Sequence, residues 1–331
     1  MLTSPPPIVV RARDLQAVVL VLLSAALFGS LAVLAQLAYG TGVSVLGLLL
    51  GRFMVAAAVL WLIVVVLRRP LPSRGALLAA VALGAGYSSM ALSFAASLKH
   101  IEADLADLLL FAYPVLVSLG AAVLGRERFS PRRAGALTTA AAGIALALTG
   151  GGTGVIDPLG VGLALVSALI YALYVLASSS LLGRTDPFVL AASVSSGAAI
   201  TFLGDAVAHG QLAPRGGVTG IGLVFAVALS SSVLGTSAFM AGVRRLGASR
   251  ASIVSSAEPA LTAAFAFAAF GDRFGTVQLI GAGLVLASVP ILEVKRSRSN
   301  SDRHASRTGA GRSHHALRDH PATCTVAAAS S

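Results

Sequence analysis

Charged residues are scarce in this sequence. Asp, Glu, Lys and Arg make up 11% of its 331 residues, whereas a soluble domain carries about 25%. Such a composition cannot cover a soluble globule of this size with polar surface, so soluble proteins are excluded. The hydrophobic share of 56% and the mean hydropathy of +0.87 instead indicate a protein that lies in a lipid bilayer.

Cysteine and the common catalytic motifs are also lacking. Cys324 is the only cysteine, so no disulfide can form within the chain. No phosphate-binding G-x-x-x-x-G-K-[ST] loop is present, because the glycine-rich stretch 150–154 has no lysine, and H-E-x-x-H and G-x-S-x-G are absent. We therefore predict a protein that is not an enzyme and that uses neither cofactor nor metal.

Long apolar runs, in contrast, are abundant. A membrane-spanning helix needs about 20 mostly apolar residues, and ten runs approach or exceed this length. They lie at 15–38, 44–67, 75–97, 103–125, 131–149, 158–182, 187–207, 218–241, 248–270 and 274–293. Continuous apolar runs favour helices over the alternating strands of a barrel. The predicted fold class is an all-α integral membrane protein with ten transmembrane helices.

Basic residues are distributed unevenly between the connecting segments. With the N-terminus inside, 20 Lys and Arg residues fall on the inner side and three, Lys99, Arg215 and Arg273, on the outer side. The positive-inside rule then predicts a multi-pass protein of the cell membrane with both termini in the cytoplasm. We attribute the net charge of +11 to this topology and to contact with anionic lipids, so nucleic acid is not an expected partner.

An internal repeat organises the chain. Residues 94–114 and 239–259 align without a gap at an offset of 145, and Glu127 then meets Asp272. This offset contains five predicted helices. Because five is odd, the two copies must lie upside down relative to each other in the membrane. Inverted repeats are typical of secondary transporters, which bind their substrate near the midplane between the copies.

The repeat also sets the predicted domain boundaries. A second match, between SAAL at 24–27 and SALI at 167–170, lies near the start of each copy. The predicted parts are a cytoplasmic N-terminal segment (1–14), a first repeat (15–149), a linker (150–157), a second repeat (158–293) and a disordered basic cytoplasmic tail (294–331).

Four stretches match the landmarks of one known family. They are LLLFAYPVLVSLGAAVLGRERFSPRRAGAL at 108–137, LFGSLAVLAQLA at 27–38, the triplet Gly51-Arg52-Phe53, and EPALTAAFAFAAFGDRF at 258–274. On these residues the chain resembles the EamA family of the drug/metabolite transporter superfamily. The resemblance covers residues 15–293, although Asp272 stands where the second repeat usually has Glu. It implies two inverted five-helix repeats that carry small metabolites, often by export.

Glu258 is the residue most informative about function. It lies near the middle of the predicted helix 248–270, where a charge costs about 2.5–3.5 kcal/mol on insertion scales. Pro259 follows it and predicts a kink, as Pro114 does in the first repeat. We predict that Glu258 binds substrate or a proton and that the two prolines mark moving helices. The alternative is a protonated carboxyl that hydrogen-bonds to a neighbouring helix.

Other polar and aromatic residues are predicted at a similar depth. Tyr113 precedes Pro114 as Glu258 precedes Pro259, and Tyr171 and Tyr174 share one helix face. The predicted substrate-binding residues are Glu258, Tyr113, Tyr171, Tyr174, Gln36, Ser89 and Arg52, with Tyr87 and Ser88 as further candidates. Packing in the core is the alternative for the tyrosines, and Arg52 could instead snorkel to the interface or pair with an acid.

Acidic residues at the predicted helix ends are interpreted as structural, because they can form ion pairs with basic neighbours. Glu127 and Asp272 end two helices on opposite faces, where basic neighbours can pair with them. His100, Asp104 and Asp107 share a helix face and could bind a divalent cation. Acids are also favoured at a helix N-terminus by its dipole, so we predict no metal site.

The predicted function is a secondary transporter. It moves a small polar metabolite or an amino acid across the cell membrane by alternating access, in the direction of export, with a proton as a candidate second cargo. One alternative is a polytopic enzyme that acts on a lipid-soluble substrate through Glu258 or the segment from His100 to Asp107. Another is a membrane scaffold that transports nothing. A homo-oligomer is compatible with each of these.

Overall fold

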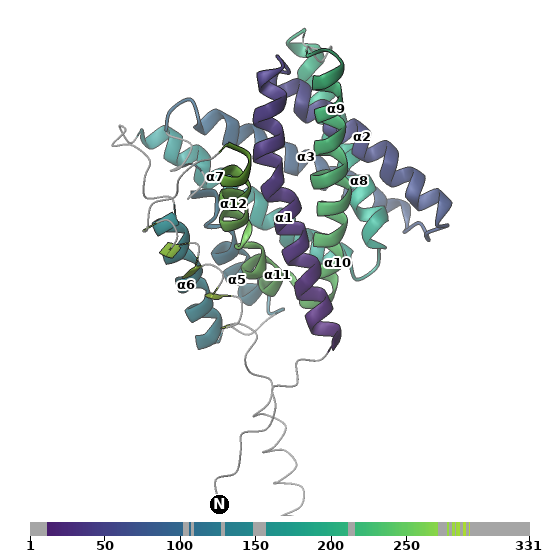
Figure 1. Cartoon of the computed structure of the whole chain (residues 1–331). Helices are drawn as coiled ribbons and strands as arrows, with labels where there is room; N and C mark the ends of the chain where they lie inside the picture. Colours follow the sequence, from purple (N-terminus) through teal and green to yellow (C-terminus); the bar gives the residue numbers. More distant parts are fainter. Residues whose placement is uncertain are drawn as a thin grey trace, which may run out of the picture. The chain divides into compact units, whose positions relative to one another are not determined.

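The structure is entirely helical where it is described. This computed structural model describes residues 12–101, 106, 109–126, 130–147, 157–210 and 216–270, with scattered positions between 277 and 291. All of them belong to one compact unit that covers residues 10–292. No strand occurs among the described residues (Figure 1), which confirms the prediction of an all-helical protein.

The helices follow the predicted spans closely. They are α1 (Ala12–Gly40), α2 (Val45–Val66), α3 (Arg74–Ser97), α5 (Tyr113–Val123), α6 (Pro131–Ala147), α7 (Pro158–Leu181), α8 (Pro187–Ala208), α9 (Gly217–Val227), the π-helix η1 (Ala228–Gly235), α10 (Thr236–Leu246), α11 (Ala248–Ser255) and α12 (Glu258–Phe270). Seven helical stretches of the described chain are long and apolar enough to cross a membrane. The last predicted span, 274–293, lies largely outside the described residues, so the count of ten remains a prediction.

Small residues face the interior and large apolar residues face outward. The buried positions are mostly Ala, Val, Gly and Ser, whereas Val65, Leu78 and Val218 are 69%, 70% and 89% exposed. In a soluble protein such exposed side chains would be costly, but lipid solvates them as well as a protein core does. Close approach of small residues then lets the helices pack by van der Waals contact.

Each helix of the first repeat packs mainly against the second repeat. Helix α1 contacts α9, η1, α10 and α12, α2 contacts α8, α3 contacts α7 and α8, and α5 contacts α7 and α11. Figure 1 shows α1 running beside the green helices α9 and α10. The surface between the two repeats is therefore the core of the bundle.

Two hydrogen bonds repeat the same contact in opposite directions. The Ser24 hydroxyl donates to the carbonyl of Gly235 at 2.8 Å, and the Ser167 hydroxyl donates to the carbonyl of Met90 at 3.1 Å. Ser24 and Ser167 begin the matched stretches SAAL and SALI, and Met90 and Gly235 are separated by the repeat offset of 145. Such reciprocal contacts are expected of two bodies that are related by a two-fold axis.

Two predicted spans are broken rather than kinked. Span 248–270 consists of α11 and α12 with a turn at residues 256–257, and a turn at residues 111–112 precedes α5 in the first repeat. The two turns are again 145 residues apart. A proline at the second position of each new helix explains the break, because it has no N–H to continue the preceding helix and fits the first turn of a new one.

The span predicted at 218–241 is longer than its apolar run. It continues to Leu246 because Arg244 and Arg245 extend the last turn of α10, and Gly247, at a φ of +83°, ends it. The stretch η1 inside it has π-helical hydrogen bonding. Its three consecutive serines, at positions 230–232, gave no sign of this in the sequence.

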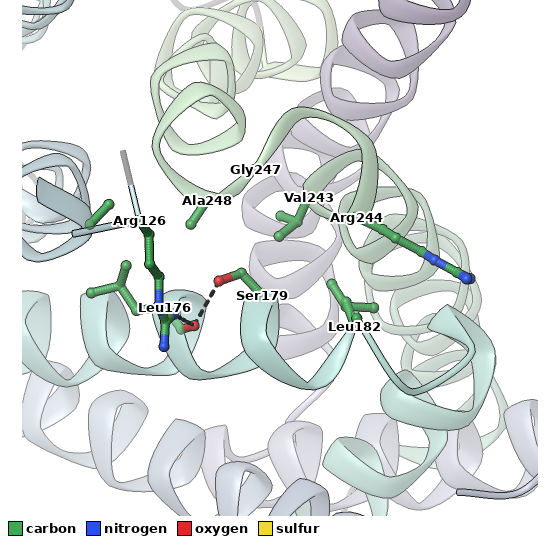
Figure 2. A pocket seen from close by; sticks show the side chains of 10 residues that line it. Arg126, Leu176, Ser179, Leu182, Val243, Arg244, Gly247 and Ala248 are labelled. Atoms are coloured by element: carbon green, nitrogen blue, oxygen red, sulfur yellow. Dashed lines mark hydrogen bonds between the residues drawn. The ribbon is translucent and has the colours of Figure 1, made fainter. Parts of the chain in front are cut away.

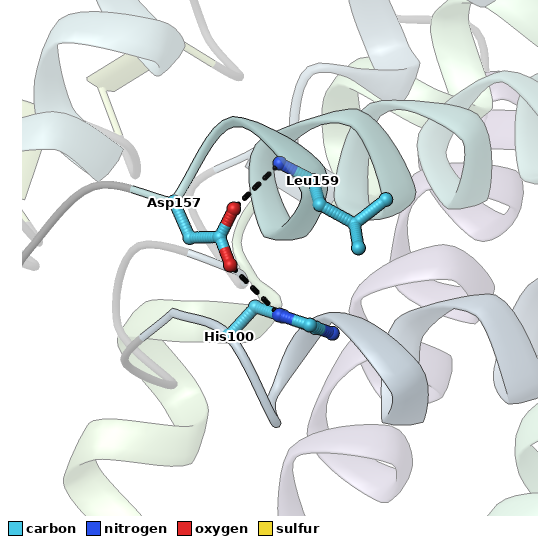
Figure 3. A network of polar contacts seen from close by, with 3 residues as sticks. All are labelled: His100, Asp157 and Leu159. Carbon is cyan, nitrogen blue, oxygen red and sulfur yellow. Dashed lines mark hydrogen bonds and ion pairs between the residues drawn. The ribbon is translucent and has the colours of Figure 1, made fainter.

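A side-chain contact joins the first repeat to the start of α7 at one end of the bundle. His100 donates from Nδ1 to Oδ2 of Asp157 at 2.8 Å, and Oδ1 of Asp157 accepts the amide of Leu159 at 2.9 Å (Figure 3). Asp157 is the N-cap residue of α7. The amide of Leu159, and then the hydrogen bond and charge of His100, hold the pKa of the Asp157 carboxyl below its ordinary value.

Removing the Asp157 carboxylate is therefore expected to destabilise the start of α7. Asp157→Asn keeps a capping oxygen and loses the ion pair, whereas Asp157→Ala loses both, so we expect melting temperatures in the order wild type, Asn, Ala. A lowered native pKa stabilises the fold above the unfolded pKa, and this contribution is lost as pH falls through the native pKa. The difference between wild type and Asp157→Asn should therefore shrink once the pH falls below the ordinary carboxyl range of about 4. A difference that persists undiminished at pH values well below this range would contradict this account.

Candidate substrate site

Four tyrosines from three helices meet in the interior and form what we call the tyrosine cluster. Tyr171 and Tyr174 of α7 stack at 5.8 Å between ring centroids. Tyr87 of α3 meets both rings edge-on, at 6.3 and 5.5 Å, and Tyr113, the first residue of α5, meets Tyr171 at 4.6 Å. The sequence predicted each of these residues as a candidate, and the structure brings all four together.

Glu258 lies close to Tyr113, which forms one end of the tyrosine cluster. It is partly buried and is the first residue of α12, where the helix dipole favours a negative charge. Its carboxyl acts electrostatically on the hydroxyls of Tyr113 and Tyr171. Tyr113 and Glu258 occupy equivalent positions of the two repeats, and α5, which Tyr113 begins, packs against α11, the helix that ends shortly before Glu258.

The Tyr113 hydroxyl is a buried polar group that makes no hydrogen bond to any described residue. Its ring is 2% exposed, and the hydroxyl has no partner within hydrogen-bond geometry, although Ser255 lies nearby. A buried polar group of this kind costs stability.

Arg52 lies at the other end of the cluster. Its Nη2 donates to the hydroxyl of Tyr87 at 3.3 Å, and its guanidinium carbon lies 4.5 Å from the centre of the Phe53 ring. The residue is 4% exposed. Arg52 therefore does not snorkel to the interface, because its side chain is directed into the aromatic interior of the bundle.

The remaining predicted residues are not joined to this cluster. Gln36 and Ser89 are exposed, and the Ser89 hydroxyl donates to the carbonyl of Ala85 in its own helix. Ser88 is buried and donates to the carbonyl of Gly84. Glu127 and Asp272 lie outside the described residues, as do Asp104 and Asp107. No cluster of potential metal ligands occurs in the part of the chain that the structure describes.

Sequence reasoning missed a pocket at one end of the bundle. Its volume is about 360 Å³, and its walls come from the ends of α5, α7 and α10 and the start of α11 (Figure 2). Arg126 and Ser179 both donate to the carbonyl of Leu176, at 3.0 and 2.7 Å. Arg126 and Arg244 had served only as topology signals, since a pocket formed where four helix ends meet has no local sequence pattern.

Comparisons with known proteins bear on the family and the fold. The sequence matches the EamA-like transporter family twice, over residues 15–149 and over residues 158–293. It is 28% identical over 292 residues to the uncharacterized transporter YcbK of Bacillus subtilis (strain 168), a match that covers 84% of this chain and 93% of that protein. One crystal structure with 18% sequence identity has a TM-score of 0.73 and covers 85% of this chain and 98% of the other, which shows a shared fold.

Proposed function

The chain belongs to the EamA-like transporter family, and from this premise we propose that it is a secondary transporter of a small polar metabolite or an amino acid. It works by alternating access and exports its substrate across the cell membrane. Family membership supports a multi-pass membrane transporter. Substrate, direction and mechanism are the content of the proposal.

One observation carries the proposal. Glu258, a carboxyl deep in the second repeat, begins a new helix beside the tyrosine cluster and next to the matching break of the first repeat. Broken helices whose ends meet at the midplane are a common construction for substrate sites in transporters. Aromatic faces and a carboxyl favour an ammonium group or a proton over a polyanion.

The repeats supply the mechanism of alternating access. Reciprocal contacts of the two repeats, such as those of Ser24 and Ser167, support a two-fold relation between them. With five spans in each repeat, that axis lies in the membrane plane and the copies are inverted. Exchange of the two repeat conformations then exposes the central site alternately to the two sides.

The basic end of the bundle forms the cytoplasmic side in this proposal. Arg126 and Arg244 line the pocket at this end, which we assign as the inner entrance. The excess of basic residues on this side supports the orientation with both termini inside. Anionic lipids are the expected neighbours of these arginines.

Uptake into reconstituted vesicles tests the proposal. The purified full chain is inserted into liposomes and screened with radiolabelled amino acids and simple metabolites, with and without a pH gradient. We expect saturable accumulation of at least one compound that depends on the protein. Vesicles that accumulate none of them, with protein that is folded and correctly inserted, would contradict the proposal.

A further inference from the structure

Arg52 is a buried cation with no counter-ion among the described residues. It lies two turns into α2 and is 4% exposed, and the one side-chain hydrogen bond that it makes within this part of the chain goes to the hydroxyl of Tyr87. No carboxylate of the described residues lies within ion-pair distance of it, and its Nε is buried without an acceptor. Arg69, which follows the end of α2, does have an acidic partner, because it lies 3.6 Å from Asp186 at the start of α8.

An unpaired guanidinium in this place is costly. A buried charge loses its hydration, and no described carboxylate supplies a compensating negative charge. The neighbouring groups cannot do so, since the Phe53 ring and the Tyr87 phenol are neutral and Phe202 stacks on Phe53 at 5.7 Å. A buried guanidinium without a described counter-ion points to an anion that comes from outside the chain.

We propose that Arg52 binds a carboxylate group of the transported substrate. This inference rests on the proposed function and specifies its substrate class as a molecule with a single carboxylate. The Nε and Nη groups of one guanidinium match the two oxygens of a carboxylate in planar geometry. The body of the molecule then extends along Tyr87 toward Tyr171 and Tyr174.

A phosphate fits this position less well. A phosphate dianion needs more than one cation in an apolar surrounding, and α8, α9 and η1, which pack against α2, contain no Lys or Arg. The aromatic walls exclude water and strengthen the attraction to one carboxylate. Tyr87, whose hydroxyl accepts from Arg52, is itself only partly buried.

Ligand-induced thermal stabilisation of the purified full chain in detergent tests the assignment. The probes are alanine, leucine and phenylalanine, each against its amide, and sodium acetate against sodium chloride at equal ionic strength. At least one carboxylate is expected to raise the melting temperature of the wild type in a concentration-dependent way. Its amide and chloride are expected to do so at least about tenfold less effectively.

Two substitutions and a control complete the test. Arg52→Gln is expected to weaken carboxylate binding at least about tenfold and, without ligand, to melt no lower than the wild type, because an unpaired buried charge has gone. Arg52→Lys keeps the positive charge but loses the paired N–H donors of the guanidinium. It should therefore bind the carboxylate more weakly than the wild type but more tightly than Arg52→Gln. Arg69→Gln, which removes an exposed arginine beyond the same helix, should bind as the wild type does.

Several outcomes would overturn the inference. They are stabilisation of the wild type by none of the carboxylates, equal stabilisation by the amides, and equal stabilisation by chloride, which would identify an inorganic anion. Undiminished binding by Arg52→Gln, or its failure to fold, would assign Arg52 a structural role. The binding measurement requires no transport. Vesicles that show no uptake therefore contradict only the proposed transport function. If uptake is intact but the wild type shows no preference for carboxylates over their amides, only the assignment of Arg52 as the carboxylate site is contradicted.

Discussion

Replacing Glu258 with glutamine is expected to abolish transport or uncouple it from the pH gradient, while the amount of folded protein in the membrane stays unchanged. Glutamine keeps the size of the side chain but can neither carry a negative charge nor release a proton. Hydrogen bonds to charged groups are worth about 1.5–3 kcal/mol, so we expect a loss of at least about tenfold in rate. Uptake into vesicles with and without a pH gradient measures it.

Asp205→Asn is a matched control for this substitution. Asp205 lies near the end of α8, away from the tyrosine cluster, and contacts His209 at 3.2 Å. Like Glu258→Gln, this substitution exchanges an acid for its amide. Because Asp205 lies away from the tyrosine cluster, transport by this variant should resemble that of the wild type. Full and still pH-dependent transport by Glu258→Gln would remove Glu258 from the mechanism.

A single methyl group at Gly197 is expected to destabilise the bundle severely. Helices α3 and α8 cross so closely there that a Cβ atom on Gly197 would overlap the carbonyl oxygen of Val81, and one on Gly84 would overlap that of Val194. Backbone cannot move aside as a side chain can. We therefore expect Gly197→Ala and Gly84→Ala to cost about 3 kcal/mol or more, read as a lower melting temperature and aggregation in size-exclusion chromatography.

The same two helices contain matched controls. A Cβ atom on Gly86 of α3 or Gly204 of α8 would meet nothing within 4 Å. Gly86→Ala and Gly204→Ala should therefore stay within about 0.5 kcal/mol of the wild type. If Gly197→Ala were as stable as Gly204→Ala, the close crossing of the two repeats would be contradicted.

Much of the helical architecture could be predicted from the sequence. Hydropathy located the spans because a bilayer sets one length for all of them, and Pro114 and Pro259 marked where two spans break. The repeat offset of 145 also predicted that Tyr113 and Glu258 are equivalent. These signals are local or periodic, and a single chain displays them without knowledge of its tertiary contacts.

The orientation of side chains could not be predicted in the same way. Helix α2 is apolar on every side, so its sequence does not indicate which face lies inward. Polarity alone favoured a place for Arg52 at the interface or in an ion pair, and the structure shows neither among the described residues. Gln36 and Ser89 were chosen for polarity and depth, yet the structure leaves both exposed. The π-helical stretch at 228–235 and the inner pocket depend on how helices from both repeats meet, which no local pattern encodes.

The central claim is that two inverted copies of one repeat meet at the tyrosine cluster. It is tested most directly by topology mapping of equivalent connections, with single cysteines placed in 130–133 and in 271–273 after Cys324 is replaced. We expect a membrane-impermeant thiol reagent, applied to intact cells, to label 271–273 and to reach 130–133 only after the cells are opened. Labelling of both connections from the same side would contradict the inverted repeat and with it the proposed mechanism.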